Sequence, residues 1–473
     1  MSISGDYFDE GSDLYLDDKE VREKINECKK CISEGATYSH IEIIDEVIQL
    51  CLEYDFTEDG LYLTNSLLEV APYNSELWQS KGIFLNNLFE FEEAYQCFNK
   101  AISLNPNDVD TLMNKSVTED NLGMFNEAVE SLEKALCIEP YNEEIFFNLG
   151  VLYEKKEMFD KAVEYFKNAV KIENNYGESW YELGFCYENL EKYDSALDVY
   201  NKYLEIDPYS FTGWYNKGIV LSKLGKYAEA IDSFELSIAL KEDFASSWFN
   251  CGIVYSRLNR LDDALNAFLK ASEIDPFDET ILFSLGQIYE EFNNFPQAIK
   301  MFSRAVELDD EYFEAYLARG YCYDFVGKYH LALKDFNRAI TLTDNSIDAW
   351  AAKAELEYSL GNLEKSIESY KEIVKIDSNN FGIWYKLAET YIELGSWLEG
   401  IKAYDRCLKL QPGNANSYYG KAKINFLLNR TQDAIECLKS AFCLDPSMKN
   451  EFAKEYPEIK GSKLFAKLLG ENL

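Results

Sequence analysis

The sequence predicts an all-α fold, an α-solenoid of stacked antiparallel helix pairs. The first observation is a fixed period: one pattern of small and large residues recurs every 34 residues, twelve times, from Ile41 to Met448, without an insertion or a deletion. The second is that each period holds two small residues twelve places apart, one for each of two helices. The third is physical: a unit of this size cannot bury its own apolar face, so consecutive units stack.

Small residues mark where the two helices of a repeat approach each other. The repeats begin at Ile41, Ser75, Val109, Glu143, Gly177, Phe211, Ala245, Glu279, Phe313, Ile347, Phe381 and Ala415. The eighth place of a repeat is Gly, Ala or Ser in eleven of the twelve, with Ile48 as the exception, and the twentieth place is small in all twelve. A larger side chain at either place would force the helices apart against normal interior packing.

Large apolar residues fill the space between the helices, and turn residues end them. The fourth and twenty-fourth places are large in most repeats, as Trp180 and Tyr200 show. Proline at the thirty-second place, as in Pro208, stops the second helix. Glycine between the two helices, as in Gly123 and Gly225, indicates the inner turn.

The two ends of the chain differ from the repeats. Residues 1–16 are acidic and without periodicity, which predicts a disordered acidic tail. Within residues 17–40, a helical stripe through Val21, Ile25 and Cys28 predicts an N-terminal capping helix. Residues 449–473 contain Pro457, which breaks any thirteenth repeat, and we expect capping helices there because terminal repeats need a cover.

The repeat pattern resembles the tetratricopeptide repeat (TPR) family over residues 41–448. The family signature stands here as Trp180, Leu183-Gly184, Tyr187, Ala196, Tyr200, Tyr203 and Pro208. The resemblance implies a right-handed superhelix in which the first helix of each repeat lines a concave groove. Four repeats depart from the signature, at Ile48 in the eighth place and at Glu119, Glu357 and Asn425 in the eleventh.

Charge limits the classes of partner. The chain has 46 basic and 84 acidic residues, a net charge of −38, so nucleic acid and anionic membrane surfaces would be repelled. We therefore expect neutral to basic partners. The alternative is that the negative charge only keeps the protein soluble. No apolar stretch is long enough to insert into a membrane, and the first residues lack a signal-peptide pattern. With eleven scattered cysteines, this composition indicates reduced thiols and a cytoplasmic protein.

Residues for chemistry are scarce, so we expect no enzyme. There are two histidines, His40 and His330, and no phosphate-binding loop, dinucleotide fingerprint or zinc-ligand spacing. We accordingly expect no catalytic residues, no cofactor and no metal site. The pair Cys28 and Cys31 could serve redox or metal chemistry, but Cys28 shares a helical stripe with Ile25 and more simply packs against the first repeat.

Aromatic and asparagine residues recur at the fifth and sixth places, which the family resemblance assigns to the groove. The fifth place holds Phe147, Tyr181, Tyr215, Phe249 and Phe283, and the sixth holds Asn114, Asn148, Asn216 and Asn250. An asparagine ladder could grip the backbone of an extended peptide, because each amide both donates and accepts. The same residues could instead pack neighbouring repeats together.

The ninth place is apolar in six successive repeats. These residues are Ile83, Val117, Val151, Phe185, Ile219 and Ile253. An exposed apolar strip usually marks an interaction site, although the strip could also pack against the next repeat. A partner with apolar anchors fits it. In the family, clamps for chaperone C-terminal tails use a lysine at the fifth place; no repeat here has one, so the chain should not be such a clamp.

Two functions follow from these observations. The first is a non-catalytic protein-interaction scaffold that binds an extended or helical partner segment in the groove. The alternative is an accessory or substrate-recruiting arm for a separately encoded enzyme, such as a glycosyltransferase.

Overall fold

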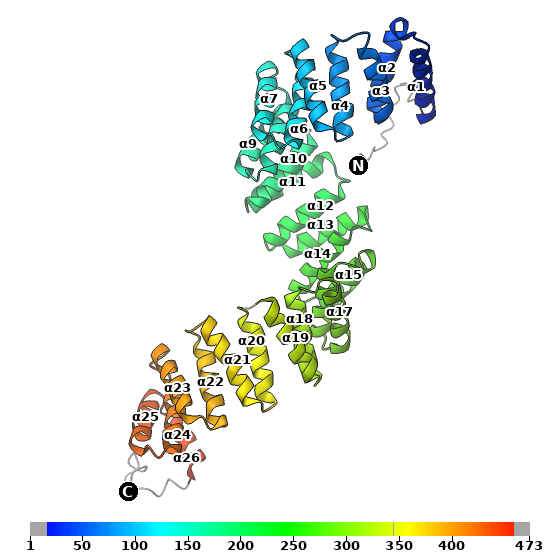
Figure 1. Ribbon diagram of the computed structural model, residues 1–473. Helices are drawn as coiled ribbons and strands as arrows, with labels where there is room; N and C mark the ends of the chain where they lie inside the picture. The colour runs from blue at the N-terminus through cyan, green and yellow to red at the C-terminus, as the bar shows by residue number, and fades with distance from the viewer. Residues whose placement is uncertain (1–16, 344, 458–473) are drawn as a thin grey trace. The chain divides into compact units, whose positions relative to one another are not determined.

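The computed structural model describes residues 17–343 and 345–457, and this part of the chain is a series of antiparallel helix pairs (Figure 1). It contains 26 α-helices, one short 3-10 helix and no strand in the described residues. The chain divides into two compact units, Met1–Lys241 and Glu242–Leu473. The predicted tail at residues 1–16 and the end of the predicted C-terminal cap at residues 458–473 lie outside the described residues.

The first unit holds repeats 1 to 6. Its helices are α1 (Asp18–Ser33), η1 (Thr37–His40), α2 (Ile41–Glu53), α3 (Thr57–Leu68), α4 (Ser75–Asn87), α5 (Phe91–Leu104), α6 (Val109–Asn121), α7 (Phe125–Ile138), α8 (Glu143–Lys155), α9 (Phe159–Ile172), α10 (Gly177–Asn189), α11 (Tyr193–Ile206), α12 (Phe211–Lys223) and α13 (Tyr227–Leu240).

The second unit holds repeats 7 to 12. Its helices are α14 (Ala245–Arg257), α15 (Leu261–Ile274), α16 (Glu279–Glu291), α17 (Phe295–Leu308), α18 (Phe313–Phe325), α19 (Tyr329–Leu342), α20 (Ile347–Ser359), α21 (Leu363–Ile376), α22 (Phe381–Leu394), α23 (Trp397–Leu410), α24 (Ala415–Leu427), α25 (Thr431–Leu444) and α26 (Met448–Glu455).

The small residues lie where the pattern predicted them. A Cβ added to Gly150 would come within 2.5 Å of the Phe166 ring, and one added to Gly184 within 2.5 Å of the Tyr200 ring. The same clash recurs in every repeat that has glycine at the eighth place. The twentieth-place alanines, such as Ala196, are fully buried. The eighth-place glycine and twenty-fourth-place ring are therefore one packing device, repeated along the chain.

Turns between repeats use side chains that the period alone did not reveal. The residue before a first helix often caps it by accepting backbone N–H bonds; these caps are Asn74, Asp108, Asn142, Ser210, Asp278, Ser346, Asn380 and Asn414. Tryptophans at the fourth place add a second hydrogen bond to these turns. Trp214 Nε1 donates to the carbonyl of Pro208 at 2.9 Å, and Trp384 Nε1 to that of Ser378 at 3.0 Å.

The fifteenth place of all twelve repeats has a left-handed backbone. Five of these twelve residues are Gly, but Phe89 (φ 62°), Glu157 (φ 57°) and Glu191 (φ 55°) are not. A side chain costs about 1–2 kcal/mol in this conformation.

Replacing Glu191 by glycine should therefore raise the unfolding free energy by about 1 kcal/mol, because relief of the strain in the left-handed turn outweighs the larger conformational entropy that glycine gives the unfolded chain. Urea denaturation measures the change. The matched control is Gly225→Ala at the same place of the next repeat (φ 74°), which should destabilise the chain. Equal effects of the two substitutions would contradict this account.

Both described ends pack on their neighbouring repeats. Val21, Ile25 and Cys28 of α1 are buried in one cluster with residues of the first repeat, so Cys28 has the packing role expected of it. At the other end, the Phe452 ring of α26 lies 6.4 Å from that of Tyr419. No helix among the described residues is both long and apolar enough to cross a membrane.

Candidate binding groove

The first helices of consecutive repeats lie side by side within each unit and share side-chain contacts. In the first unit, Lys155 Nζ of α8 lies 2.6 Å from Asp120 Oδ2 of α6. In the second unit, Lys386 of α22 pairs with Glu355 of α20. Each unit therefore has a layer of first helices, called here the first-helix layer, and it carries the residues that the sequence assigned to the groove.

The ninth-place side chains range from half-buried to exposed. In the first unit, Val117 is 43% exposed and Phe185 41%, whereas Ile83, Val151 and Ile219 are half-buried. These five residues are called the apolar strip from here on. The sixth predicted member, Ile253, is half-buried in the second unit, so the predicted run is divided between the two units. The role of the strip in binding stays a prediction.

The fifth-place aromatic residues have a packing role. Each ring contacts the twenty-fourth-place ring of its own repeat, with centroids 5.5–6.2 Å apart; the pairs are Phe147–Phe166, Tyr181–Tyr200, Tyr215–Phe234, Phe249–Phe268 and Phe283–Phe302. All five fifth-place side chains remain partly exposed. Contact with the core ring fixes them, so they offer a rigid aromatic edge at low entropic cost to any partner.

The sixth-place asparagines each use at least one amide hydrogen within the chain. Asn114 Nδ2 donates to the carbonyl of Asp110 and Asn250 Nδ2 to that of Ser246, both at 2.9 Å. Two others reach the preceding repeat: Asn216 Nδ2 donates to Tyr181 OH at 3.0 Å, and Asn148 Nδ2 lies 3.8 Å from Met113 Sδ. Asn148 and Asn216 thus link neighbouring first helices, whereas Asn114 and Asn250 bond within their own helices.

Three half-buried carboxylates stand in the first-helix layer of repeats 4 and 5. Burial and the nearby Glu182 raise the pKa of Glu154 to about 7, against the lowering effect of Lys155. Burial also raises the pKa of Glu182. These two residues and Glu188 are called the acidic cluster.

Glu188 has the one strong hydrogen bond in the acidic cluster. Burial raises its pKa, while Tyr200 OH, which donates to Glu188 Oε1 at 2.5 Å, and Lys223 oppose the rise. Lys155 is engaged with Asp120, and none of the three carboxylates has a cation within 4.0 Å in the described part of the chain. The sequence shows acids at these places, but only the fold shows that they are desolvated and unpaired.

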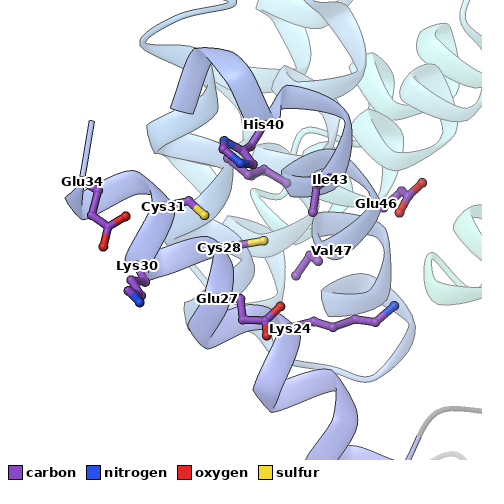
Figure 2. Close-up of a pocket in the computed structure, with 11 residues that line it drawn as sticks. Lys24, Glu27, Cys28, Lys30, Cys31, Glu34, His40, Ile43, Glu46 and Val47 are labelled. Carbon is purple, nitrogen blue, oxygen red and sulfur yellow. The ribbon is translucent and has the colours of Figure 1, made fainter. Parts of the chain in front are cut away.

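A separate pocket of about 460 Å³ lies between α1 and α2, and Figure 2 shows its lining residues. Cys28, Cys31 and His40 line it together with apolar residues such as Ile43. Burial, followed by Cys31 and Glu27, raises the pKa of the Cys28 thiol to about 11, the opposite of what a reactive thiol needs. No set of three or more His, Cys, Asp or Glu residues in the described ranges is placed to hold a metal ion.

Family models described as tetratricopeptide repeats match most of the chain. The matched residues are 75–108, 109–142, 143–176, 177–210, 212–244, 245–278, 283–347 and 385–445, and a model described as a TPR repeat matches 354–395. Five of these matches begin at a repeat start defined above, namely residues 75, 109, 143, 177 and 245. No curated protein is similar enough to match.

Several solved structures are similar to parts or most of the chain. MamA from Desulfovibrio magneticus RS-1 is 25% identical over 36% of this chain and 96% of its own, with a TM-score of 0.35. YrrB, described as a TPR protein with an unusual peptide-binding site, is 23% identical over 40% of this chain and 97% of its own (TM-score 0.36). Yeast Tom70 is 16% identical over 92% of this chain and 100% of its own (TM-score 0.36).

Proposed function

The chain belongs to the tetratricopeptide repeat family, and we propose that it is a non-catalytic scaffold that binds a partner protein on its first-helix layer. One observation carries the choice of surface: in repeats 3 to 5, the exposed side chains of Val117 and Phe185 lie in the same layer as the unpaired acidic cluster. A partner that covers the exposed apolar side chains removes them from water, and a partner that brings a cation pairs the desolvated carboxylates. Both contacts would stabilise the complex.

The partner that fits is an extended or helical segment with apolar anchors and at least one lysine or arginine. Phe185 meets the Phe159 ring edge to face, with centroids 6.4 Å apart, which holds the exposed ring in place for an apolar anchor. Glu154 and Glu182 would face a cation of the partner. A C-terminal carboxylate would meet these acids and be repelled, in keeping with the absence of lysine at the fifth place.

We also propose the cytoplasm as the compartment and keep the predicted division into an N-terminal cap, twelve repeats and a C-terminal cap. All eleven cysteines lie within the described residues and none forms a disulfide, and nine of them are buried or half-buried in helices. Reduced thiols of this kind are usual in a reducing compartment.

The test is affinity capture from native extract with the full chain and with a variant carrying Val151→Asp, Phe185→Asp and Ile219→Asp. The wild type should recover partners that the variant loses, because carboxylates would replace three of the five residues of the apolar strip. Circular dichroism checks that the variant remains helical, and Phe185→Asp alone serves if the triple variant unfolds.

The matched control places a carboxylate on another surface of the same unit, at Leu236 of α13, which is 44% exposed. Leu236→Asp should leave the recovered proteins unchanged. The proposal is wrong if a folded strip variant recovers the same proteins as the wild type. Loss of a separately encoded glycosyltransferase from the strip variant alone would identify the scaffold as that enzyme's accessory arm.

A further inference from the structure

A second polar site lies in the second unit, in repeat 10. Helices α19, α20 and α21 enclose a pocket of about 590 Å³, called here the repeat-10 pocket. Trp350 and Glu357 from α20 and Ser369 from α21 line it. Glu357 is only 3% exposed. None of these residues stands at a place assigned to the groove, so this site is independent of the proposed function.

The pocket lies where repeat 10 lacks the eleventh-place tyrosine that half of the repeats have. In repeat 4, the eleventh-place Tyr153 stacks on the twenty-third-place Tyr165 with centroids 5.3 Å apart, and the nineteenth-place Lys161 lies 4.8 Å above the Tyr153 ring. The same three places in repeat 10 are Glu357, Ser369 and Lys365. No ring occupies the space between them, and a carboxylate borders it instead.

The Glu357 carboxylate is only half satisfied. Asn362 Nδ2 donates to Oε2 at 2.7 Å. The nearest cation to Oε1 is Lys365 Nζ at 3.9 Å, beyond hydrogen-bond distance, on a side chain that is 65% exposed. Lys353 lies over the Trp350 ring, 5.2 Å from its centroid, and makes no ion pair with Glu357 in the described part of the chain. A buried carboxylate in this state favours an added cationic hydrogen-bond donor.

The preceding repeat shows what fills the corresponding space. There the Arg319 guanidinium donates from Nε and Nη2 to the two carboxylate oxygens of Asp335 at 2.7 and 2.8 Å, and from Nη1 to Ser303 at 3.1 Å. It also lies 5.4 Å from the centroid of Tyr316, the counterpart of Trp350. Repeat 9 thus carries its own guanidinium between an aromatic ring and a buried carboxylate.

We propose that the repeat-10 pocket binds an arginine side chain of a partner protein, whose guanidinium pairs with Glu357. Glu368 and Glu372 also line the pocket, so three carboxylates face two lysines and the excess charge is negative. Arginine fits better than lysine because its planar fork can reach Oε1 while Oε2 keeps its bond to Asn362.

Repeat 3 supplies the internal control. It has the same residue types as repeat 10 at the seventh, eleventh and twenty-third places. Its carboxylate, however, has a partner for each oxygen: Glu119 accepts from Ser131 Oγ at 2.7 Å and lies 3.3 Å from Lys115 Nζ. Glu119 therefore has no free oxygen for a partner, and its substitution should not affect arginine binding.

The probe is N-acetyl-arginine amide, titrated into the full chain, with N-acetyl-citrulline amide as its neutral counterpart of the same shape. The readout is the NMR signal of the Trp350 indole N–H, assigned with Trp350→Phe. The arginine amide should shift this signal in a saturable way, and citrulline amide should not. Glu357→Gln should weaken binding about tenfold or more, the loss expected for one charge-assisted pair. Glu119→Gln should bind as the wild type.

A second variant keeps the proposal testable if Glu357→Gln is poorly folded. Glu357→Tyr restores the residue most common at the eleventh place, so its ring should fill the pocket, keep the chain folded and abolish the titration. Equal shifts with arginine and citrulline amides would overturn the proposal. So would an unchanged titration in a folded Glu357→Tyr chain, or a shift caused by acetate, an anion, in place of the arginine amide.

Discussion

Replacing Phe166 by alanine should lower the unfolding free energy of the first unit by about 3–5 kcal/mol, the cost of a large cavity in a packed core. Phe166 is fully buried, and its ring lies against Gly150 and 5.7 Å from the Phe147 centroid. Glycine at the eighth place cannot fill the void, since it has no side chain. Urea denaturation followed by tryptophan fluorescence measures the loss.

Hydrogen exchange should place that loss in repeats 3 to 5, because each repeat of a solenoid contacts only its neighbours. The matched control is Phe277→Ala, the same change at a ring that is 75% exposed, which should cost less than about 0.5 kcal/mol. A cost below about 1 kcal/mol at Phe166 would mean that the eighth-place glycine and twenty-fourth-place ring do not form the packing device described above.

The period predicts the fold because it reports packing that every repeat must satisfy. Gly150, Gly184 and Ala196 are small for a steric reason, and that reason is visible from their spacing. The left-handed turn at the fifteenth place was visible only where glycine occupies it. Phe89 and Glu191 adopt the same left-handed conformation because the helices on both sides impose it. Neither residue type favours this conformation, so the sequence does not predict it there.

The candidate sites were less predictable than the fold, because they depend on which neighbour each side chain hydrogen-bonds or pairs with. Glu119 and Glu357 share their repeat place and their companions at the seventh and twenty-third places. In repeat 3 the sixteenth and nineteenth places are Met124 and Glu127, which offer a carboxylate no donor. In repeat 10 they are Asn362, which donates to Glu357 at 2.7 Å, and Lys365, which lies 3.9 Å from it. The pattern places both acids correctly but cannot tell a closed ion pair from an open pocket.

Replacing Glu182 by lysine should raise the dissociation constant of a basic partner on the first-helix layer by at least about 30-fold, or 2 kcal/mol, the lower range for disrupting a desolvated interfacial charge pair. Glu182 is half-buried, has no cation within 4.0 Å in the described part of the chain, and acts on Glu154. A lysine there would repel the partner's cation and pair with Glu154 instead. Titration of the purified partner, at low and high salt, measures the change.

The control is Glu164→Lys on α9, an exposed acid of the same unit that changes the net charge equally. If both substitutions weaken binding alike, and added salt removes the effect, the cause is the overall charge of −38 and the acidic cluster has no specific role.

The pH profile separates these two explanations further, because stability and binding should respond to Glu154 with opposite signs. The folded pKa of Glu154, about 7, lies above its ordinary value of 4.5, so the folded chain holds the extra proton between these values. This residue's contribution to stability is therefore full below about pH 4.5 and is lost as pH rises through 7.

A cation of the partner favours the ionised form of Glu154, so binding should release a proton and strengthen as pH rises through about 7, then level off. Burial and Glu182 raise the pKa of Glu154 and Lys155 opposes them, while Cys186 Sγ donates to Glu154 Oε2 at 4.0 Å. Glu154→Gln should remove this residue's part of both profiles. A binding profile that stays flat in the wild type, or that keeps its slope in Glu154→Gln, would show that the partner's cation does not act on Glu154.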